Sequence, residues 1–599
     1  MRKSSNQKNF FNFFILILIC FLTGQIKAAP AQTAQPVTQP IGILARTWQT
    51  TGGLPFPVQP PVPVGFISPN APVDEVNYIC AQWDSSVQPD TVPFAENYSV
   101  SEIKLTQQQH FVRLLAGPSS SSNGAWIMRS EYVRGKTPQQ LADIFALPNG
   151  APPVEIVNVE MPASTDPVNG PFYVLWTGVC GPIRDWGNGG AVQNRLVADF
   201  GTNYFPGYLY TSSSTRNHRQ AIGQIALSYK PLAGTGNTWN VADYLDSFIP
   251  QAYSDMENVY HSLDYLNYTG FGGQQLQDAL TQIGPEKFDN FSFLNFRNAL
   301  LFGNSILDRR IFCHQTDHFC RHNKMFEKCC KLEANFGIEA LGEFDKYNNI
   351  HSQTGGLLGY IDFQSQENWI VGIGAAGMYN DLHSITTLRD KGHGENIKFG
   401  FYAGYAPKSF FIDGLISFGF DWNKFSRKIN FYDIDRTAHS KPRGGDIEIH
   451  LQGGFNVLNL ITPIARVSYL FNRQNNVTEY DADSLNLNII GFNTHVIRTN
   501  LGIQASHIWG NSDIKVVPQA NASWVTDFNL NNRKINANLR DLGNNFSVSV
   551  DHKTHCYFAG GVGCNLLFPN CLTIFANYDA ELRSDFTTQM LRLGIESKF

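Results

Sequence analysis

From residue 334 onward, hydrophobic and polar residues alternate with a period of two. In the first such run Phe336, Ile338 and Phe344 alternate with Glu339 and Glu343. Because successive side chains of a strand point to opposite faces, the pattern predicts strands with one apolar and one polar face. We expect twelve strands, at residues 334–347, 354–364, 368–380, 395–406, 409–424, 445–457, 461–473, 495–508, 515–528, 554–566, 571–583 and 587–599. The short run "FSVSV", residues 546–550, is assigned to a loop.

The polar face of these strands decides between two architectures. A soluble sandwich also alternates, but its inner face carries a second apolar layer. Here Glu, Asp, Asn, Gln, Arg and Gly recur on that face, and a water-filled lumen can hydrate such groups whereas a sandwich core cannot. Strands of about ten residues, aromatic residues near strand ends and alternating short and long connections are typical of a transmembrane β-barrel. We therefore predict a 12-stranded antiparallel transmembrane barrel at residues 334–599.

Upstream of residue 334 the apolar spacing becomes helical. Residues 241–311 carry apolar positions at helix-like intervals, with breaks at Pro250 and Pro285. Pro285 suits the first turn of a helix. We predict a helical linker at residues 240–311, whose last helix, from about residue 285, is diluted by Asn and Arg.

Residues 64–235 have short mixed runs, which predict a small α+β domain. One helix in it is well defined by Thr137 as N-cap, Pro138 at the first position and Gln140 at the third. Residues 29–63 are rich in Pro and Gln, which favours an extended leader without a core. The predicted fold class is thus β-rich and multidomain, a small α+β domain followed by a helical linker and a barrel.

The first 28 residues have the pattern of a signal peptide. Arg2, Lys3 and Lys8 precede the apolar run "FFNFFILILICFL", which is followed by small residues. This run of 13 residues falls short of the roughly 20 that a spanning helix needs. We expect cleavage between Ala28 and Ala29, and hence export.

Composition narrows the possible partners. Removal of residues 1–28 takes away four positive charges and no negative ones, so the formal charge moves from −5 to −9. Such a charge argues against nucleic acid as a partner. The chain also lacks the sequence motifs G-x-S-x-G and H-E-x-x-H. We expect no catalytic residues, no metal and no cofactor, while activity of residues 64–235 stays open.

Nine cysteines remain after signal removal, and in an exported chain they first suggest disulfides. Cys80 and Cys180 are the simplest pair within residues 64–235. Residues 312–333 form a Cys-rich insertion in which three histidines lie among four cysteines. The spacing fits no standard zinc pattern, so disulfides or intermolecular links are preferred to a metal site. The candidates in this insertion are Cys313, Cys320, Cys329 and Cys330.

Residues 240–599 resemble the translocator domain of autotransporters, the type V secretion proteins. The similar stretches include "TGGLLGYIDFQSQENWIVGIGAAGMY", "FGFYAGYAPKSFFIDGLISFGFDW", "ITPIARVSYL", "VPQANASWVTDF", "IFANYDAELRSDF" and "LRLGIESKF". The resemblance implies an N-terminal helix in the barrel lumen and residues 64–235 as a passenger at the cell surface. It also implies the Sec translocon, periplasmic chaperones, the barrel assembly machinery and the outer-membrane bilayer as partners. Relatives that cleave themselves use an Asn of this helix, for which Asn290, Asn295, Asn298 and Asn304 are available.

The end of the sequence, "MLRLGIESKF", would then be an outer-membrane assembly signal. Leu591, Leu593, Ile595 and Phe599 are expected to face lipid, and Arg592, Glu596 and Lys598 the lumen. The last strand is expected to pair with the first, which removes both sheet edges.

Three functions remain open from the sequence. The first is an autotransporter that displays its passenger for adhesion or for contact with a host-surface ligand. The second is an outer-membrane pore with a periplasmic N-terminal domain. The third is a barrel-carried enzyme or toxin-like passenger, for which the residues to inspect are Arg129, Arg134, Trp186, Gly189, Gly190 and Gln193.

Overall fold

The fold was analysed in a computed structural model of the full sequence. The structure describes residues 43–48, 73–74, 76–77, 80, 91–96, 98, 100–105, 109–116, 125–161, 173–199, 203–204, 216–251, 254–268, 273–320, 334–347, 350–364, 368–384, 388–407, 410–455, 457, 460–510, 514–531, 533–550, 554–583 and 586–599. The predicted cleavage site at Ala28 and Ala29 lies outside these residues, as do Cys329, Cys330 and the side chain of Cys320.

The N-terminal region has two antiparallel sheets that share a core. The larger sheet has the order β1-β2-β6-β7-β4, with β8 on β7, and the smaller has the order β3-β5-β9. The strands are β1 (Ile43–Trp48), β2 (Val100–Leu105), β3 (Gln109–Leu115), β4 (Trp126–Ile127), β5 (Glu155–Met161), β6 (Val174–Val179), β7 (Val192–Asp199), β8 (Asn203–Tyr204) and β9 (Arg216–Ala221). Leu105, Phe111 and Val157 are among the buried residues that join the two sheets. This α+β region agrees with the predicted class.

Two details of this region can be compared with the sequence. Helix α4 (Pro138–Ile144) begins as predicted: Thr137 Oγ1 accepts a hydrogen bond from the Gln140 backbone at 3.3 Å, and Gln140 Oε1 accepts one from the Thr137 backbone at 2.9 Å. Part of the predicted leader, in contrast, is the strand β1, which pairs with β2 along its whole length. A Pro-rich segment can form an edge strand over a stretch without proline, because the backbone N–H groups of that stretch can donate hydrogen bonds to the neighbouring strand.

Helices occupy the region between the sheets and the barrel. They are α5 (Asn237–Asp246), α6 (Asp255–Tyr268), α7 (Gln274–Ile283), the short η2 (Glu286–Phe288) and α8 (Asp289–Cys320). Pro250 lies between α5 and α6, as the sequence indicates. Helix α8 extends past the predicted end at residue 311 and includes the first part of the Cys-rich insertion. Among the described residues, no helix has both the length and the apolar character required to cross a bilayer.

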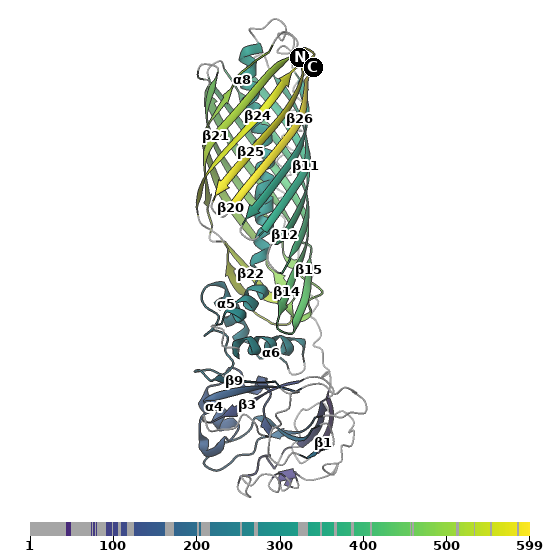
Figure 1. The fold of residues 1–599 in the computed structure, drawn as a ribbon, viewed down its shortest axis with the longest axis vertical. Helices are drawn as coiled ribbons and strands as arrows, with labels where there is room; N and C mark the ends of the chain where they lie inside the picture. Colours follow the sequence, from purple (N-terminus) through teal and green to yellow (C-terminus); the bar gives the residue numbers. More distant parts are fainter. Residues whose placement is uncertain are drawn as a thin grey trace, which may run out of the picture. The chain divides into compact units, whose positions relative to one another are not determined.

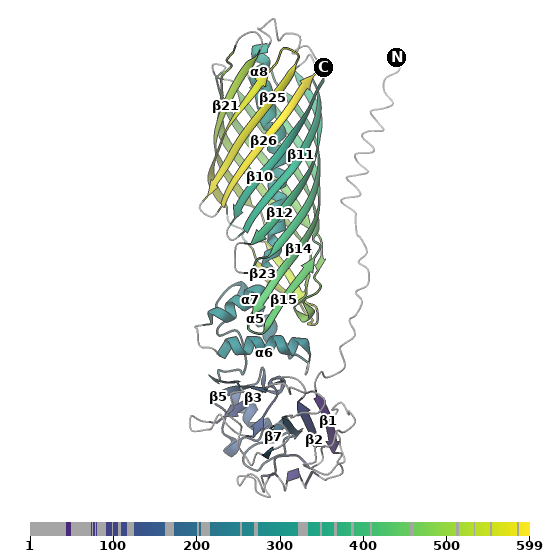
Figure 2. The same ribbon diagram turned by 45° about the vertical axis from the view of Figure 1, so that its right-hand side comes forward.

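Twelve strands within the described residues close into an antiparallel barrel around α8, which confirms the predicted architecture (Figure 1). They are β10 (Ala334–Tyr347), β11 (Ile350–Gln364), β12 (Trp369–Ser384), β13 (Lys391–Tyr405), β14 (Phe410–Phe431), β16 (Arg443–Phe455), β17 (Ile461–Gln474), β20 (Phe492–Ser506), β21 (Lys515–Asn529), β24 (His555–Leu567), β25 (Leu572–Arg583) and β26 (Phe586–Lys598). The first and last strands, β10 and β26, pair in register (Figure 2).

The two ends of the barrel differ. The C-terminus lies at the end with the short turns 365–368, 406–409 and 568–571, which we call the short-turn end. The connections 432–442, 475–491 and 530–554 lie at the opposite, long-loop end. These loops contain β15 (Ile434–Ser440), which pairs with β14, and a four-stranded sheet of β18 (Val477–Thr478), β19 (Leu487–Ile489), β22 (Lys534–Leu539) and β23 (Phe546–Ser549).

The assignment of residues 546–550 to a loop was wrong, because Phe546–Ser549 is the strand β23. Its Phe546 and Val548 are buried in a core that also contains Tyr244 of α5, Leu280 of α7 and Phe425 of β14. The strands β11, β13 and β14 also extend further towards the long-loop end than predicted. For β14 and β23 the linker helices explain the difference, because Ile429 and Phe431 of β14 and Phe546 of β23 are buried in the core that contains α5, α6 and α7 residues.

Candidate functional site

The candidate site is the lumen of the barrel with α8 inside it. One part of the helix is apolar: Leu301, Phe302 and Ile306 are buried against the wall residues Leu358 and Leu415. Gly303 lies close to the wall, because a side chain there would come within 2.7 Å of the His450 ring. The helix therefore packs directly on the wall rather than standing free in water.

Near its N-terminal end, α8 is fixed by Arg297. The side chain of Arg297 is 1% exposed, its Nε donates to Glu343 of β10 at 2.7 Å and its Nη1 donates to Glu581 of β25 at 2.8 Å. Arg498 of β20 contacts the other oxygen of Glu581 at 2.5 Å. The interior carboxylates of strands far apart in sequence are therefore connected through one helical arginine.

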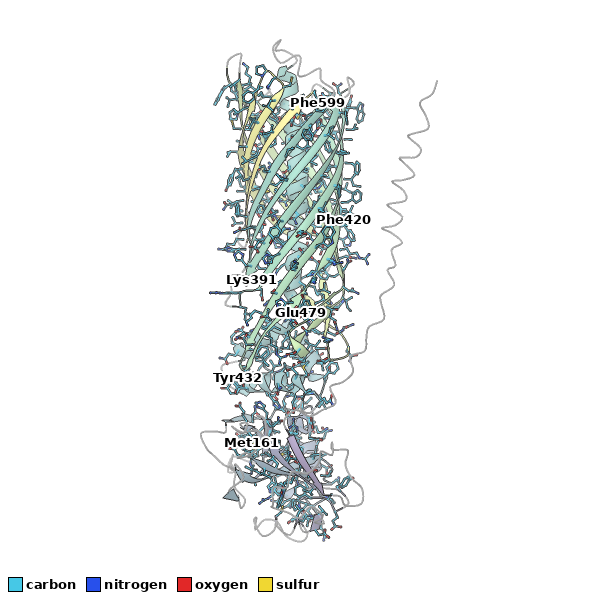
Figure 3. All side chains as sticks on the ribbon, turned by 90° about the vertical axis from the view of Figure 1, so that its right-hand side faces the viewer. Met161, Lys391, Phe420, Tyr432, Glu479 and Phe599 are labelled. Carbon is cyan, nitrogen blue, oxygen red and sulfur yellow. The ribbon has the colours of Figure 1, made fainter. Side chains whose placement is uncertain are left out.

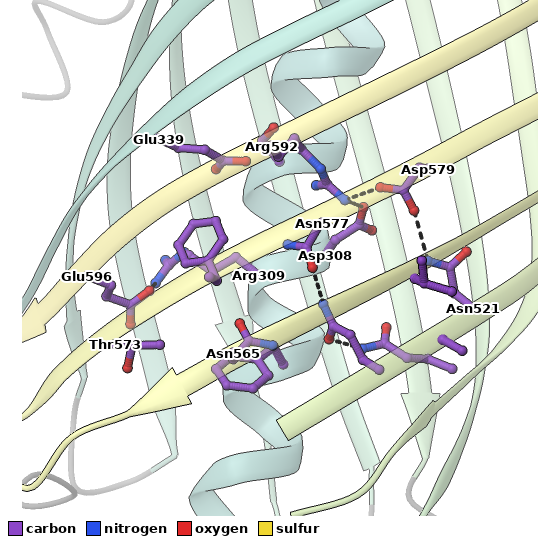
Figure 4. A pocket seen from close by; sticks show the side chains of 17 residues that line it. Asp308, Arg309, Glu339, Asn521, Asn565, Thr573, Asn577, Asp579, Arg592 and Glu596 are labelled. Atoms are coloured by element: carbon purple, nitrogen blue, oxygen red, sulfur yellow. Dashed lines mark hydrogen bonds and ion pairs between the residues drawn. The ribbon is translucent and has the colours of Figure 1, made fainter. Parts of the chain in front are cut away.

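A second anchor lies two-thirds of the way along the helix. Asp308 accepts hydrogen bonds from Arg466 of β17 at 2.6 Å and from Arg592 of β26 at 3.0 Å. Arg592 in turn donates to Asp579 of β25 at 2.6 Å (Figure 4). Asp308 thus connects α8 to β17 and β26 directly and to β25 through Arg592. The next residue, Arg309, pairs with Asp362 and lies 3.3 Å from Glu596.

The short-turn end supplies further contacts to the helix. His314 Nε2 lies 3.1 Å from Asp413 of β14, and Gln315 donates to Thr462 of β17 at 2.9 Å.

Cavities of about 30, 70 and 90 Å³ lie between α8 and the wall. Since one water needs roughly 10–15 Å³, they hold a few waters but do not form a wide channel. The lumen charges that the sequence suggested would be hydrated are thus paired in two ways. Some pair with α8, as Asp362 does with Arg309, and others pair on the wall, as Lys398 does with Asp446 and Glu448.

The outer wall is apolar, as a lipid-facing surface requires. Phe336, Trp369, Leu501 and Val562 are at least 45% exposed, and Phe420 and Phe599 also lie on this wall (Figure 3). In the last strand Leu591, Leu593 and Ile595 are 44%, 48% and 54% exposed, whereas Arg592 and Glu596 are buried. This alternation agrees with the predicted faces of β26.

Phe599 combines an exposed side chain with a paired backbone. Its side chain is 60% exposed, while its backbone N–H donates to Ala334 at 2.9 Å and its carbonyl accepts from Ala334 at 3.2 Å. The last residue therefore continues the pairing that closes the barrel. Its role as an assembly signal stays a prediction.

The cysteine predictions meet a different outcome. Cys180 is a buried free thiol, and burial raises its pKa to about 12, so the structure does not contain the predicted Cys80–Cys180 disulfide. Cys80 is also buried. Cys313 lies within α8, buried in the lumen with Arg309 Nη1 4.0 Å from its sulfur. Cys313 is therefore a buried residue of the helix and not of a separate loop.

The residues of the N-terminal region that the sequence singled out have structural contacts. Arg129 and Arg134 are buried and pair with Glu257 and Asp264 of α6. Gln193 donates to the Pro93 carbonyl at 2.6 Å, and Gly189 has a φ of 68°. Trp186 is half-buried beside Ile183, and Gly190 has a φ of 99°. These positions are not gathered into one site, and sequence reasoning missed α6 as the partner of the two arginines.

The asparagines of α8 are also separated. Asn304 accepts a hydrogen bond from Arg466 at 2.6 Å, Asn295 and Asn298 are buried, and Asn290 is half-buried. Within the described residues, no group of three or more His, Cys, Asp or Glu is arranged to hold a metal ion.

Residues 338–579 match the autotransporter beta-domain family. No curated protein matches the chain. Among solved structures, the translocator domain of autotransporter NalP from Neisseria meningitidis is 14% identical with a TM-score of 0.39, over 50% of this chain and 98% of that one. The beta domain of the Bordetella autotransporter BrkA is 14% identical with a TM-score of 0.34, over 45% and 100%. The transport unit of autotransporter AIDA-I from Escherichia coli is 12% identical with a TM-score of 0.30, over 45% and 91%.

The family match includes most of the wall strands that hold Arg297, Asp308 and Arg309 of α8. Residues 338–579, which form most of this helix-filled barrel, therefore match the autotransporter beta-domain family.

Proposed function

We propose that this protein is an autotransporter that carries its own N-terminal passenger, residues 64–235, through the outer membrane and displays it at the cell surface. The Sec translocon, periplasmic chaperones and the barrel assembly machinery would serve this route. The passenger would act in adhesion or in binding a host-surface ligand.

The direction of α8 carries this proposal. Its first residue, Asp289, pairs with Arg533 in the 530–554 connection, and its later residues Arg309 and His314 approach the short-turn end. Long loops of outer-membrane barrels face the exterior and short turns the periplasm. A chain that enters the lumen from the long-loop end has its preceding residues on the exterior side.

Protease treatment of intact cells tests the proposal. Residues 64–235 should become accessible and be lost, while the barrel fragment stays in the membrane. The matched control is the same treatment after permeabilisation of the outer membrane, which gives a periplasmic protease access. If the passenger resists on intact cells and is degraded only after permeabilisation, the protein is a barrel with a periplasmic domain.

A further inference from the structure

Helix α6 buries an unusual set of polar residues on one face. Glu257, His261 and Asp264 follow the spacing i, i+4, i+7 and are 2%, 3% and 1% exposed. Buried charges of this kind require partners, because an unpaired one costs several kcal/mol. The partners of these three residues come from the passenger. Two other residues of the helix, Asp255 and Tyr265, contact the barrel loops.

On the passenger side, Arg134 is the central contact. It donates to both oxygens of Asp264, at 2.7 and 2.5 Å, and to the Leu227 carbonyl at 2.6 Å. Its guanidinium carbon lies 4.7 Å from the centre of the Tyr260 ring. Nearby, Arg129 pairs with Glu257, and the rings of His110 and His261 stack with their centres 4.3 Å apart. The contact is geometrically specific and excludes water.

On the barrel side, α6 is held at its start and near its end. Asp255 accepts two hydrogen bonds from Arg436 of β15, at 2.7 and 2.6 Å, and one from the Ser484 backbone at 3.1 Å. The rings of Tyr265 and Tyr432 stack with their centres 3.7 Å apart. Tyr432 also donates to Glu160 of the passenger strand β5 at 3.0 Å.

Helix α5 adds an independent contact with the loop sheet. The side-chain amide of Asn237 donates to the Ser549 carbonyl and accepts from the Ser549 backbone, both at 2.8 Å. The ring of Tyr244 lies 4.6 Å from that of Phe546, and its hydroxyl accepts from the Leu539 backbone at 3.1 Å. Asp246, in the same helix, accepts from the Tyr229 backbone at 3.0 Å and so ties α5 to the passenger.

We propose that α5 and α6 form a latch that holds the folded passenger on the barrel loops without a covalent connection. A cut between α6 and α7 leaves the passenger, α5 and α6 on one fragment, and that fragment remains bound to the barrel. Its binding partner is the surface of this same chain formed by β15, the 475–491 connection and β22–β23.

The experiment uses the purified full chain in detergent, with a specific protease site in place of residues 269–272. After cleavage, the two fragments should elute together in size-exclusion chromatography. If they separate at once in the parent chain, the latch does not exist. Purified protein keeps this result independent of the proposed membrane orientation, which protease treatment of cells tests separately.

Two sets of variants test the contacts of α5 and of α6 with the barrel loops separately. Tyr244→Ala should speed dissociation of the cut fragments by about tenfold or more, because it removes a buried ring and a hydrogen bond to the loop sheet. The matched control is Asp243→Asn in the same helix, whose exposed carboxylate pairs only with the surface residue Lys230 among the described contacts and should leave dissociation unchanged. Equal dissociation of both variants would overturn the role of α5.

A charge exchange between Arg436 and Asp255 distinguishes loss of the α6 contact from misfolding. Arg436→Glu places two carboxylates together and should speed dissociation, and the added change Asp255→Arg should restore retention. If the double variant dissociates as fast as the single one while both barrels stay folded, the α6 contact does not contribute to retention.

Discussion

Arg297 illustrates how a single residue fixes a helix inside a membrane barrel. It lies among Glu343, Asp345 and Glu581 with 1% of its side chain exposed. Removal of one partner from a buried ion pair typically costs about 3–5 kcal/mol, because the other charge is left buried. From the sequence, Arg297 is only a polar interruption of an apolar helix, since its partners are 46 and 284 residues away.

At the passenger contact, two residues respond to pH in opposite directions. Burial raises the pKa of Glu131 to about 7, with Arg129 opposing the shift, so its contribution to stability falls as pH rises from about 4.5 through 7. Burial and the neighbouring His261 lower the pKa of His110 below 6.5, so its contribution falls as pH drops below 6.5.

Glu131→Gln should therefore raise passenger stability at about pH 8, by no more than about 3 kcal/mol, and have little effect near pH 4.5. Urea midpoints of the passenger transition in the full chain measure the difference. His110→Gln is the complementary variant and should reduce the loss of stability on the acid side. An equal effect of Glu131→Gln at both pH values would contradict the assignment.

Phe599 gives a prediction for assembly. Deletion of Phe599 or Phe599→Asp should reduce the amount of folded barrel in the outer membrane, because the residue carries both an exposed apolar side chain and the final backbone pair with Ala334. The control is Lys598→Gln, which changes the neighbouring polar position. Unchanged amounts of folded barrel for both Phe599 variants would contradict the role of Phe599 as an assembly signal.

At the scale of elements, regular alternation made the barrel predictable. The twelve strands and the outward face of β26 follow directly from period-two patterning, and the start of α4 follows from its capping residues. Strand β23 did not follow, because four residues carry too little pattern and are stabilised by contacts with α5. The full length of α8 was also missed, since its polar residues after 311 pair with the barrel wall.

The position of α8 predicts a closed pore. Full-length protein in planar bilayers should show little ion conductance, because among the described residues the helix occupies the lumen beside cavities of about 30, 70 and 90 Å³. Removal of residues 237–311 should produce stepwise conductance as water enters the space and hydrates the carboxylates on the wall. A shorter deletion within residues 64–235 is the control and should leave the pore closed. Equal conductance of all three proteins would show that α8 does not occlude the barrel.

At the scale of the whole molecule, the sequence separated a passenger, a linker and a barrel, but not their mutual contacts. Asp255 of α6 contacts Arg436 and Ser484 of the barrel loops, while Asp264 of the same helix contacts Arg134 of the passenger. Such pairs join residues more than 100 positions apart, and no local pattern encodes them. The linker is therefore better described as an interface than as a spacer.

The polar face of α6 has a practical consequence for anyone who would graft a foreign cargo onto this scaffold. A fusion that replaces the passenger but keeps α6 would strip Glu257 and Asp264 of their arginines and leave two carboxylates on a bare helical surface. Neutral residues at these two positions would avoid the two unpaired carboxylates in the fusion protein. The natural exchange unit of the scaffold is the cargo with its matching helix.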